Sequence, residues 1–283
     1  MKQIQFMNVT KCFGTNTAVN DVTLSLEGGK VYGLLGRNGA GKTTLLNLLT
    51  NRLFTTSGEV LVDGEPVKEN DNALSKIYFM SEANLYPETM TLKQAITWSK
   101  EFYPGLDEGY AYELSDKFKL DCNKKYRSLS TGYKSIYKLI IALSCNAEIT
   151  LLDEPVLGLD ANHRDMFYKE LIKNYSQNPR TIIISTHLIE EAADMIEEAI
   201  IIKEGNLLMK DTVENLTSQG ATVSGPIKKV DEFIVGRNVI GTETLGGLKS
   251  AFLLERLDKK QLPEGLELSR LNLQQLFIQL TNS

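Results

Sequence analysis

Eight consecutive residues near the start of the chain carry its most specific chemistry, because residues 36–43 read Gly-Arg-Asn-Gly-Ala-Gly-Lys-Thr with the spacing G-x-x-x-x-G-K-[ST]. Glycines let the backbone curl so that successive N–H groups point at phosphate oxygens. The spacing predicts that Lys42 reaches the β- and γ-phosphates of a nucleoside triphosphate and that the Thr43 hydroxyl holds Mg²⁺. The residues expected to contact the nucleotide here are Gly36, Arg37, Asn38, Gly39, Ala40, Gly41, Lys42, Thr43 and Thr44.

The segments on either side of this loop supply the context that it requires. Residues 31–35 form an apolar run that suits a buried strand, and residues 44–49 suit a helix whose dipole directs positive charge at the loop. The alternative is a glycine-rich turn between a strand and a helix that binds no ligand. The flanking strand and helix favour the phosphate loop over that alternative.

The spacing of apolar residues predicts an α/β fold around the loop. Residues 4–13 and 18–26 alternate apolar and polar side chains, as antiparallel strands with one buried face do. After residue 145, short apolar runs alternate with helical segments, which indicates parallel strands joined by crossover helices. We therefore expect a parallel sheet with covered faces beside an antiparallel β portion.

Two regions depart from this alternation of strands and helices. Residues 83–145 have helical spacing and are predicted to form a helical insert, in which Trp98 and Phe102, at positions i and i+4, are expected to face a core. Residues 217–283 combine short strands, Gly/Pro turns and a closing helix. They predict a small C-terminal α+β accessory domain after a main domain of residues 1–216.

The composition limits the class of protein. The 283 residues carry a net charge of −5 without a basic run, so nucleic acid is not an expected partner. Cys12, Cys122 and Cys145 fit neither a disulfide framework nor metal-ligand spacing, which indicates a reducing compartment. No apolar run is long enough to span a bilayer. We expect a cytoplasmic protein, for which any membrane partner is another polypeptide.

Five further segments accompany the phosphate loop: Phe13, Leu-Ser-Thr-Gly-Tyr at 129–133, Ile-Thr-Leu-Leu-Asp-Glu at 149–154, Leu-Gly-Leu-Asp at 157–160, and His187. Together they resemble the ATP-binding subunit of a bacterial ABC transporter, over residues 4–216. The resemblance implies a P-loop NTPase core with an antiparallel β subdomain and a signature motif on the helical insert. It also implies ATP and Mg²⁺ as cofactors. The closing Leu-x-Leu-x-x-Leu-Phe helix is similar to the tails of export-type members.

The resemblance assigns catalytic roles to two of these segments. Residues 149–154 resemble the Walker B strand, so Asp153 is expected to hold Mg²⁺ and Glu154 to polarise the attacking water. The alternative is a strand-end Asp that caps the next segment. His187 matches the switch histidine that contacts the γ-phosphate. Phe13 matches the residue that stacks on adenine, although a core Phe on an amphipathic strand is nearly as well supported.

The resemblance also implies that part of the site serves a second subunit. Residues 129–133 look like the family's L-S-G-G-Q signature, with Thr131 and Tyr133 where the family has Gly and Gln. Ser130 can cap the following helix and help to make a second anion site. Residues 157–160 resemble the D-loop, which crosses the dimer interface. The residues expected near ATP from these segments are Ser130, Thr131, Gly132 and Asp160.

One departure from the family pattern concerns a glutamine that normally follows the strand at residues 77–80. Alignment on that strand places Glu82 at this position, whereas alignment on residues 85–87 places Ser81 there. We favour Glu82. Its carboxylate could reach Mg²⁺ through a water molecule but adds negative charge near the γ-phosphate.

The resemblance implies a Mg²⁺-dependent ATPase that pairs with a second ATP-binding subunit, either a copy or a homologue. It would energise transport, with export favoured, through separate membrane-spanning permease subunits at the inner face of the cell membrane. One alternative is a soluble ABC-type ATPase in a non-transport process, but the chain lacks the second cassette or long coiled coils of such proteins. Another is a nucleotide-gated module without turnover, which the presence of Asp153, Glu154 and His187 disfavours.

Overall fold

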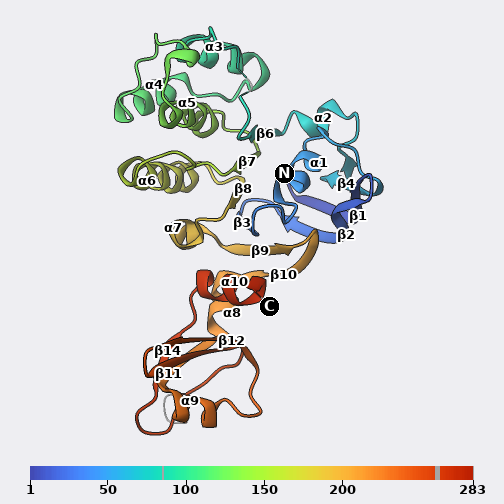
Figure 1. The fold of residues 1–283 in the computed structure, drawn as a ribbon. Coiled ribbons are helices and arrows are strands. Elements are labelled where there is room, and N and C mark those ends of the chain that lie inside the picture. The colour runs from blue at the N-terminus through green and yellow to red at the C-terminus, as the bar shows by residue number, and fades with distance from the viewer. Residues whose placement is uncertain (85, 259–261, 283) are drawn as a thin grey trace.

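A six-stranded sheet forms the centre of the computed structural model, which describes residues 1–84, 86–258 and 262–282 (Figure 1). Its strand order is β10-β9-β3-β8-β7-β6, and only the edge strand β10 pairs antiparallel to its neighbour. The strands are β3 (Val31–Leu35), β6 (Ile77–Met80), β7 (Ile149–Asp153), β8 (Thr181–Thr186), β9 (Glu198–Lys203) and β10 (Asn206–Thr212).

Successive side chains of the central strands enter two different cores, as the two-residue period of a strand requires. On β7, Leu151 packs into one core and Leu152 into the other, and both are buried. Figure 1 shows the helices that cover the two faces, with α5, α6 and α7 on one and α1 with the N-terminal sheet on the other. These helices are α1 (Lys42–Leu49), α5 (Thr131–Ser144), α6 (Ala161–Gln177) and α7 (Ile189–Ala192), the last followed by the short η2 (Ala193–Met195).

The N-terminal sheet is antiparallel and has one buried face. On β2, Val22, Leu24 and Leu26 are buried while the intervening Thr23 and Ser25 are exposed. Its strand order is β2-β1-β4-β5, and the short helix α2 follows it. The elements are β1 (Gln3–Phe13), β2 (Asn16–Glu27), β4 (Ser57–Val62), β5 (Glu65–Pro66) and α2 (Asp71–Leu74).

The predicted helical insert is present between β6 and β7. Thr91 and Gln94 form a capping box that starts its first helix, in which each residue satisfies a backbone N–H of the other. Tyr137 on α5 and Phe118 after α4 are fully buried between the helices. The insert contains α3 (Leu92–Phe102), α4 (Glu108–Lys117), η1 (Tyr126–Ser128) and α5.

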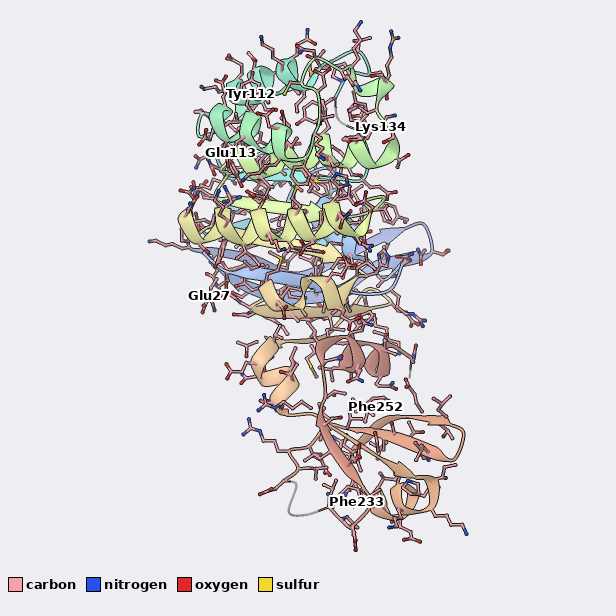
Figure 2. All side chains as sticks on the ribbon, turned by 90° about the vertical axis from the view of Figure 1, so that its left-hand side faces the viewer. Glu27, Tyr112, Glu113, Lys134, Phe233 and Phe252 are labelled. Atoms are coloured by element: carbon pink, nitrogen blue, oxygen red, sulfur yellow. The ribbon has the colours of Figure 1, made fainter. Side chains whose placement is uncertain are left out.

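The C-terminal residues form a second antiparallel sheet, of order β12-β13-β11-β14. Helix α9 packs on it through Val230, and Phe252 lies nearer to the main body than Phe233 does (Figure 2). The closing helix α10 returns to the main body, because Leu276 joins the core of α5 and α6 and Gln274 accepts the Glu190 N–H. The elements are α8 (Val213–Ser218), β11 (Ala221–Pro226), α9 (Ile227–Phe233), β12 (Val239–Leu245), β13 (Leu248–Leu253), β14 (Glu267–Arg270) and α10 (Leu273–Asn282).

The architecture confirms the predicted α/β fold with an antiparallel β subdomain, a helical insert and a C-terminal α+β extension. The domain boundary after residue 216 stays a prediction, and the contacts of α10 show that the extension and the main body share a core. Within the part of the chain that the structure describes, no helix has both the length and the apolar character that crossing a membrane requires.

Candidate nucleotide-binding site

The predicted phosphate loop connects the end of β3 to the start of α1, and two of its three glycines, Gly36 and Gly41, are sterically required. Gly41 has φ +106°, and a Cβ there would lie 2.5 Å from the carbonyl oxygen of Ala18. A Cβ on Gly36 would lie 2.8 Å from the carbonyl oxygen of Ile202. No other residue fits such close approaches of backbone to backbone, so the loop shape depends on these two positions.

Lys42 is buried within the loop, and its ammonium donates to the carbonyl oxygen of Gly36 at 2.6 Å. The Glu154 Oε1 atom lies 3.9 Å from the same nitrogen. Burial lowers the pKa of Lys42, and the carboxylates of Glu154 and Asp153 act in the opposite direction. A desolvated cation at the start of a helix is a strong point of attraction for phosphate oxygens.

Asp153 ends β7 directly behind the loop. Its Oδ2 atom accepts a hydrogen bond of 2.8 Å from the Thr43 hydroxyl, whereas its buried Oδ1 atom has no hydrogen-bond partner. A buried carboxylate oxygen without a partner is unfavourable unless a cation compensates it, and oxygen ligands are those that Mg²⁺ prefers. Thr43 and Asp153 therefore fit the predicted magnesium site.

Glu154 follows Asp153 in a left-handed conformation with φ +47°, which is strained for a residue other than glycine. Its N–H donates to the Ser185 carbonyl oxygen of β8 at 2.8 Å, and this contact holds the turn. One carboxylate oxygen lies 2.8 Å from Nδ1 of His187. The carboxylate is thus held between Lys42 and His187, which come from two other loops at the same sheet edge.

A cavity of about 710 Å³ lies over the loop and brings most of the predicted residues together. Asp153 is not among its lining residues because Thr43 covers it, and Gly36 lies beneath Lys42. The predicted residues that line it are Phe13, Arg37, Asn38, Gly39, Ala40, Gly41, Lys42, Thr43, Thr44, Glu82, Glu154 and His187.

Six further lining residues were not predicted: Asn16, Thr17, Ala18, Leu157, Glu204 and Gly205. Gly205, in the β9–β10 turn, reaches the loop because its N–H donates to the Ala40 carbonyl oxygen at 2.9 Å. A Cβ on Gly205 would lie 2.9 Å from the carbonyl oxygen of Ala18.

The signature and D-loop segments contact each other, and of their residues only Leu157 lines the cavity. The Ser135 hydroxyl donates to the Leu157 carbonyl oxygen at 2.9 Å, and a Cβ on Gly132 would lie 2.9 Å from the Gly158 carbonyl oxygen. Ser130 caps α5, and Asp160 caps α6. None of Ser130, Thr131, Gly132 and Asp160 lines the cavity of its own chain. Their predicted contact with ATP in a second subunit stays a prediction.

The structure distinguishes the two candidates for the missing glutamine. Glu82 is exposed and lines the cavity, whereas the buried Ser81 donates its hydroxyl to the Ala83 carbonyl oxygen at 3.2 Å. The competing alignment used Leu85, which lies outside the described residues. Of the two side chains, the one that faces the candidate nucleotide site is therefore Glu82.

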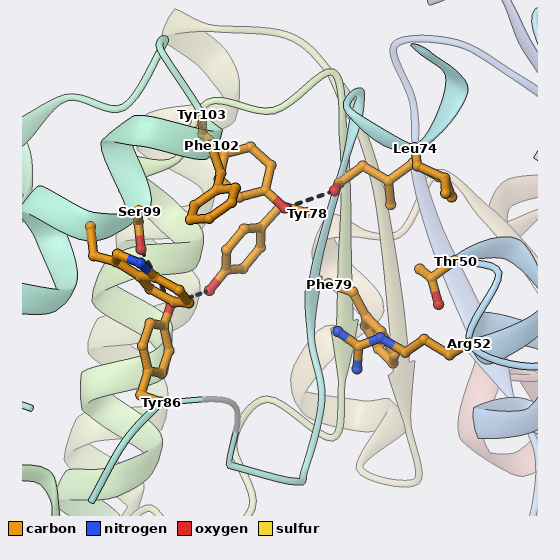
Figure 3. A pocket seen from close by; sticks show the side chains of 11 residues that line it. Thr50, Arg52, Leu74, Tyr78, Phe79, Tyr86, Ser99, Phe102 and Tyr103 are labelled. Atoms are coloured by element: carbon orange, nitrogen blue, oxygen red, sulfur yellow. Dashed lines mark hydrogen bonds between the residues drawn. The ribbon is translucent and has the colours of Figure 1, made fainter. Parts of the chain in front are cut away.

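A second hollow, of about 310 Å³, lies between α3, β6 and the end of α1 (Figure 3). The Tyr103 hydroxyl donates to the Ile77 carbonyl oxygen at 3.0 Å on one side of it. We call this hollow the aromatic groove, and define it by its lining residues Thr50, Arg52, Leu74, Ile77, Tyr78, Phe79, Tyr86, Trp98, Ser99, Phe102 and Tyr103.

The prediction that Trp98 and Phe102 face a core is wrong. Their rings contact each other with centroids 5.1 Å apart, but the residues are 44% and 59% exposed. Helix α3 buries a different stripe, which includes Ala95 and Ile96. The i, i+4 spacing correctly placed both rings on one face, and that face lines the aromatic groove.

Comparison with known proteins agrees with this geometry. Residues 19–157 match the family model described as ABC transporter. The chain is 32% identical to the ABC transporter ATP-binding protein YtrB of Bacillus subtilis, over 72% of this chain and 70% of that protein. It is also 32% identical to the Nod factor export ATP-binding protein I of Burkholderia lata, over 71% of this chain and 68% of that protein.

Among solved structures, the dimeric structure of MJ0796, a bacterial ABC transporter cassette, superposes with a TM-score of 0.65 at 27% identity. The match covers 74% of this chain and 98% of that cassette. Most of the phosphate loop, Glu154 after β7 and His187 after β8 line one cavity, and Asp153 at the end of β7 is hydrogen-bonded to Thr43 of that lining. The chain therefore belongs to the ATP-binding proteins of bacterial ABC transporters.

Proposed function

We propose that this chain is the ATP-hydrolysing subunit of an ABC transporter and that it energises export through separate membrane-spanning subunits. The observation that carries the proposal is the position of Glu154. Its carboxylate lies at the wall of the nucleotide cavity, between the Lys42 ammonium and the His187 ring. A base held next to a phosphate-binding cation is what hydrolysis of a phosphoanhydride needs.

Binding of ATP would use the loop and the start of α1. The backbone N–H groups and the Lys42 ammonium would hold the β- and γ-phosphates, and the exposed Phe13 ring would stack on adenine. Thr43 and Asp153 would hold Mg²⁺, which supplies charge neutralisation at the phosphates. The orphan Oδ1 atom of Asp153 supports this assignment.

Hydrolysis would use Glu154 and His187 together. A water molecule attacks the γ-phosphorus, its proton passes to Glu154, and the bond to the bridging oxygen of ADP breaks. His187 would orient Glu154 through Nδ1, which leaves Nε2 available to the γ-phosphate. The strained backbone of Glu154 supports a catalytic role, because such strain is concentrated at functional sites.

A second ATP-binding subunit would complete the site. Ser130, Thr131 and Gly132 of one subunit would contact the ATP of the other, and Asp160 would approach it from the D-loop. Two observations support this arrangement: these residues do not line their own cavity, and a related cassette has a dimeric structure. ATP would then stabilise the closed dimer and so increase its population relative to the open form.

The permease would dock in the aromatic groove. Exposed aromatic rings are enriched where proteins bind one another, and Trp98 and Phe102 are such rings. The apolar face of a permease helix suits this lining. The groove runs along β6, and Glu82 follows that strand, so docking could influence the nucleotide cavity. The chain would then lie at the inner face of the membrane.

Two observations favour export over import. One relative is named a Nod factor export protein, and the closing helix resembles the tails of export-type members. The transported compound would follow a path through the permease helices.

Purification of the tagged chain from detergent-solubilised membranes tests the proposal. We expect a multi-span permease to co-purify in stoichiometric amounts, and the complex to hydrolyse ATP. Recovery of an ATPase without any membrane protein would support the soluble non-transport alternative instead. A complex that binds ATP without turnover would contradict the ATPase assignment.

A further inference from the structure

A buried lysine lies on the helix that begins with the signature segment. Lys138 is only 8% exposed, and its ammonium donates to the carbonyl oxygens of Ser81 at 2.9 Å and Glu82 at 2.8 Å. Its neighbours Leu139 and Ile140 are apolar and fully buried. Burying an ammonium group is unfavourable unless its contacts compensate, so an apolar residue would pack this position at lower cost.

The loop that Lys138 contacts leads from β6 into the nucleotide cavity. Met80 is paired with Leu152 of β7, one residue before Asp153. Glu82 then presents two groups in different directions, since its carbonyl oxygen accepts from Lys138 and its side chain lines the cavity. The contact therefore fixes the backbone from which the Glu82 carboxylate extends.

The charges around Lys138 agree with this arrangement. Burial lowers the pKa of Lys138, whereas the Glu82 and Asp153 carboxylates raise it. These two carboxylates belong to the nucleotide site, although the lysine itself does not line the cavity. The Lys138 ammonium, which lies outside the cavity lining, offsets part of the negative charge that the Glu82 carboxylate adds at the cavity wall.

We propose, on the basis of the function proposed above, that Lys138 is a positioning residue for Glu82. It holds the loop of residues 81–82 on α5 and thereby sets how the Glu82 carboxylate faces the nucleotide. Helix α5 begins at Thr131, seven residues before Lys138, so one rigid helix carries both the loop anchor and the signature segment.

Hydrogen exchange of the full chain tests the anchor without any assay of activity. We expect Lys138→Met to increase amide exchange at residues 82–84 about tenfold, because the loop loses its only side-chain anchor from α5 among the described contacts. Lys169→Met is a matched control, since Lys169 lies on the surface of α6 and pairs with Asp165. Unchanged exchange in the Lys138 variant would overturn the proposal.

A double-mutant cycle on the ATPase rate tests whether Lys138 acts through Glu82. In the unmodified background, we expect Lys138→Met to lower kcat about tenfold and to change KM less than about twofold. In a Glu82→Ala background, the same substitution should lower kcat less than about twofold. Equal losses in both backgrounds would indicate a general packing role and would contradict the proposal. Absence of turnover in the unmodified complex would instead refute the ATPase function, and the exchange measurement would still decide the anchor.

Discussion

The nucleotide cavity and the aromatic groove are two hollows close to strand β6, and their linings differ in chemistry. The cavity is lined by loop backbone, Lys42 and Glu154, and it lies where β6 ends. The groove is lined by tyrosine, tryptophan and phenylalanine rings along the length of β6. The first suits a small polyanion and the second suits an apolar segment of a partner protein.

The two hollows also differ in what maintains their shape. The cavity depends on backbone geometry, with glycines in close contact at Gly41 and Gly205 and a strained turn at Glu154. The groove depends on side chains that rest on α3 and β6. Substitutions in the cavity should therefore affect chemistry, and substitutions in the groove should affect association. The predictions below separate these two effects.

The largest effect is expected for Glu154→Gln. The amide cannot accept the proton of the attacking water, so ATP turnover should fall by about 10²- to 10³-fold while ATP binding persists. In the presence of ATP, the variant should then accumulate as a dimer, which size-exclusion chromatography detects. Glu190→Gln, on the exposed surface of α7, is the control and should retain the original rate. Equal turnover of the Glu154 variant would remove this residue from the mechanism.

The next largest effect is expected for the double variant Trp98→Ser, Phe102→Ser. Loss of aromatic contacts at an interface costs about 2 kcal/mol or more, so recovery of the permease in a pull-down should fall about 30-fold. The affinity for ATP should remain unchanged, because neither residue lines the cavity. Ile172→Ser is the control, since Ile172 is also 44% exposed but lies on α6. Normal association of the double variant would exclude the groove as the docking site.

A smaller effect is expected for Phe13→Ala. The ring is 47% exposed and lines the cavity, where it would stack on adenine. Base stacking contributes about 1–3 kcal/mol, so the Kd for ATP should rise about tenfold. Phe13→Tyr keeps the ring and should bind ATP like the unmodified chain. An unchanged Kd in the alanine variant would exclude Phe13 as the residue that stacks on adenine, since the exposure of its ring already contradicts a core position.

The cavity was largely predictable from the sequence because its chemistry is encoded in short contiguous motifs. The loop directly follows its apolar strand β3, and the acid pair lies at the end of its apolar strand β7, so local spacing determines the geometry of each motif. The Lys42–Glu154 and Glu154–His187 contacts then follow from parallel strands that end at one sheet edge.

The groove and the anchor at Lys138 could not be predicted in this way. Helical spacing places Trp98 and Phe102 on one face, but only the tertiary structure shows that this face remains largely exposed. The Lys138 contact joins residues 56 positions apart, and no local pattern encodes it. The approach of Gly205 to Ala18 is likewise a contact between distant hairpins.

The smallest effect is expected for Tyr103→Phe, which tests whether the polar atoms of the groove serve the fold. The Tyr103 hydroxyl donates to the Ile77 carbonyl oxygen, an internal contact at 3.0 Å. Its loss should reduce the free energy of unfolding by about 1 kcal/mol, which denaturant titration measures. ATP affinity should not change, since β6 keeps its pairing with β7. A loss of permease association without a loss of stability would mean that this hydroxyl contacts the permease. The groove would then bind its partner through a polar contact as well as through aromatic rings.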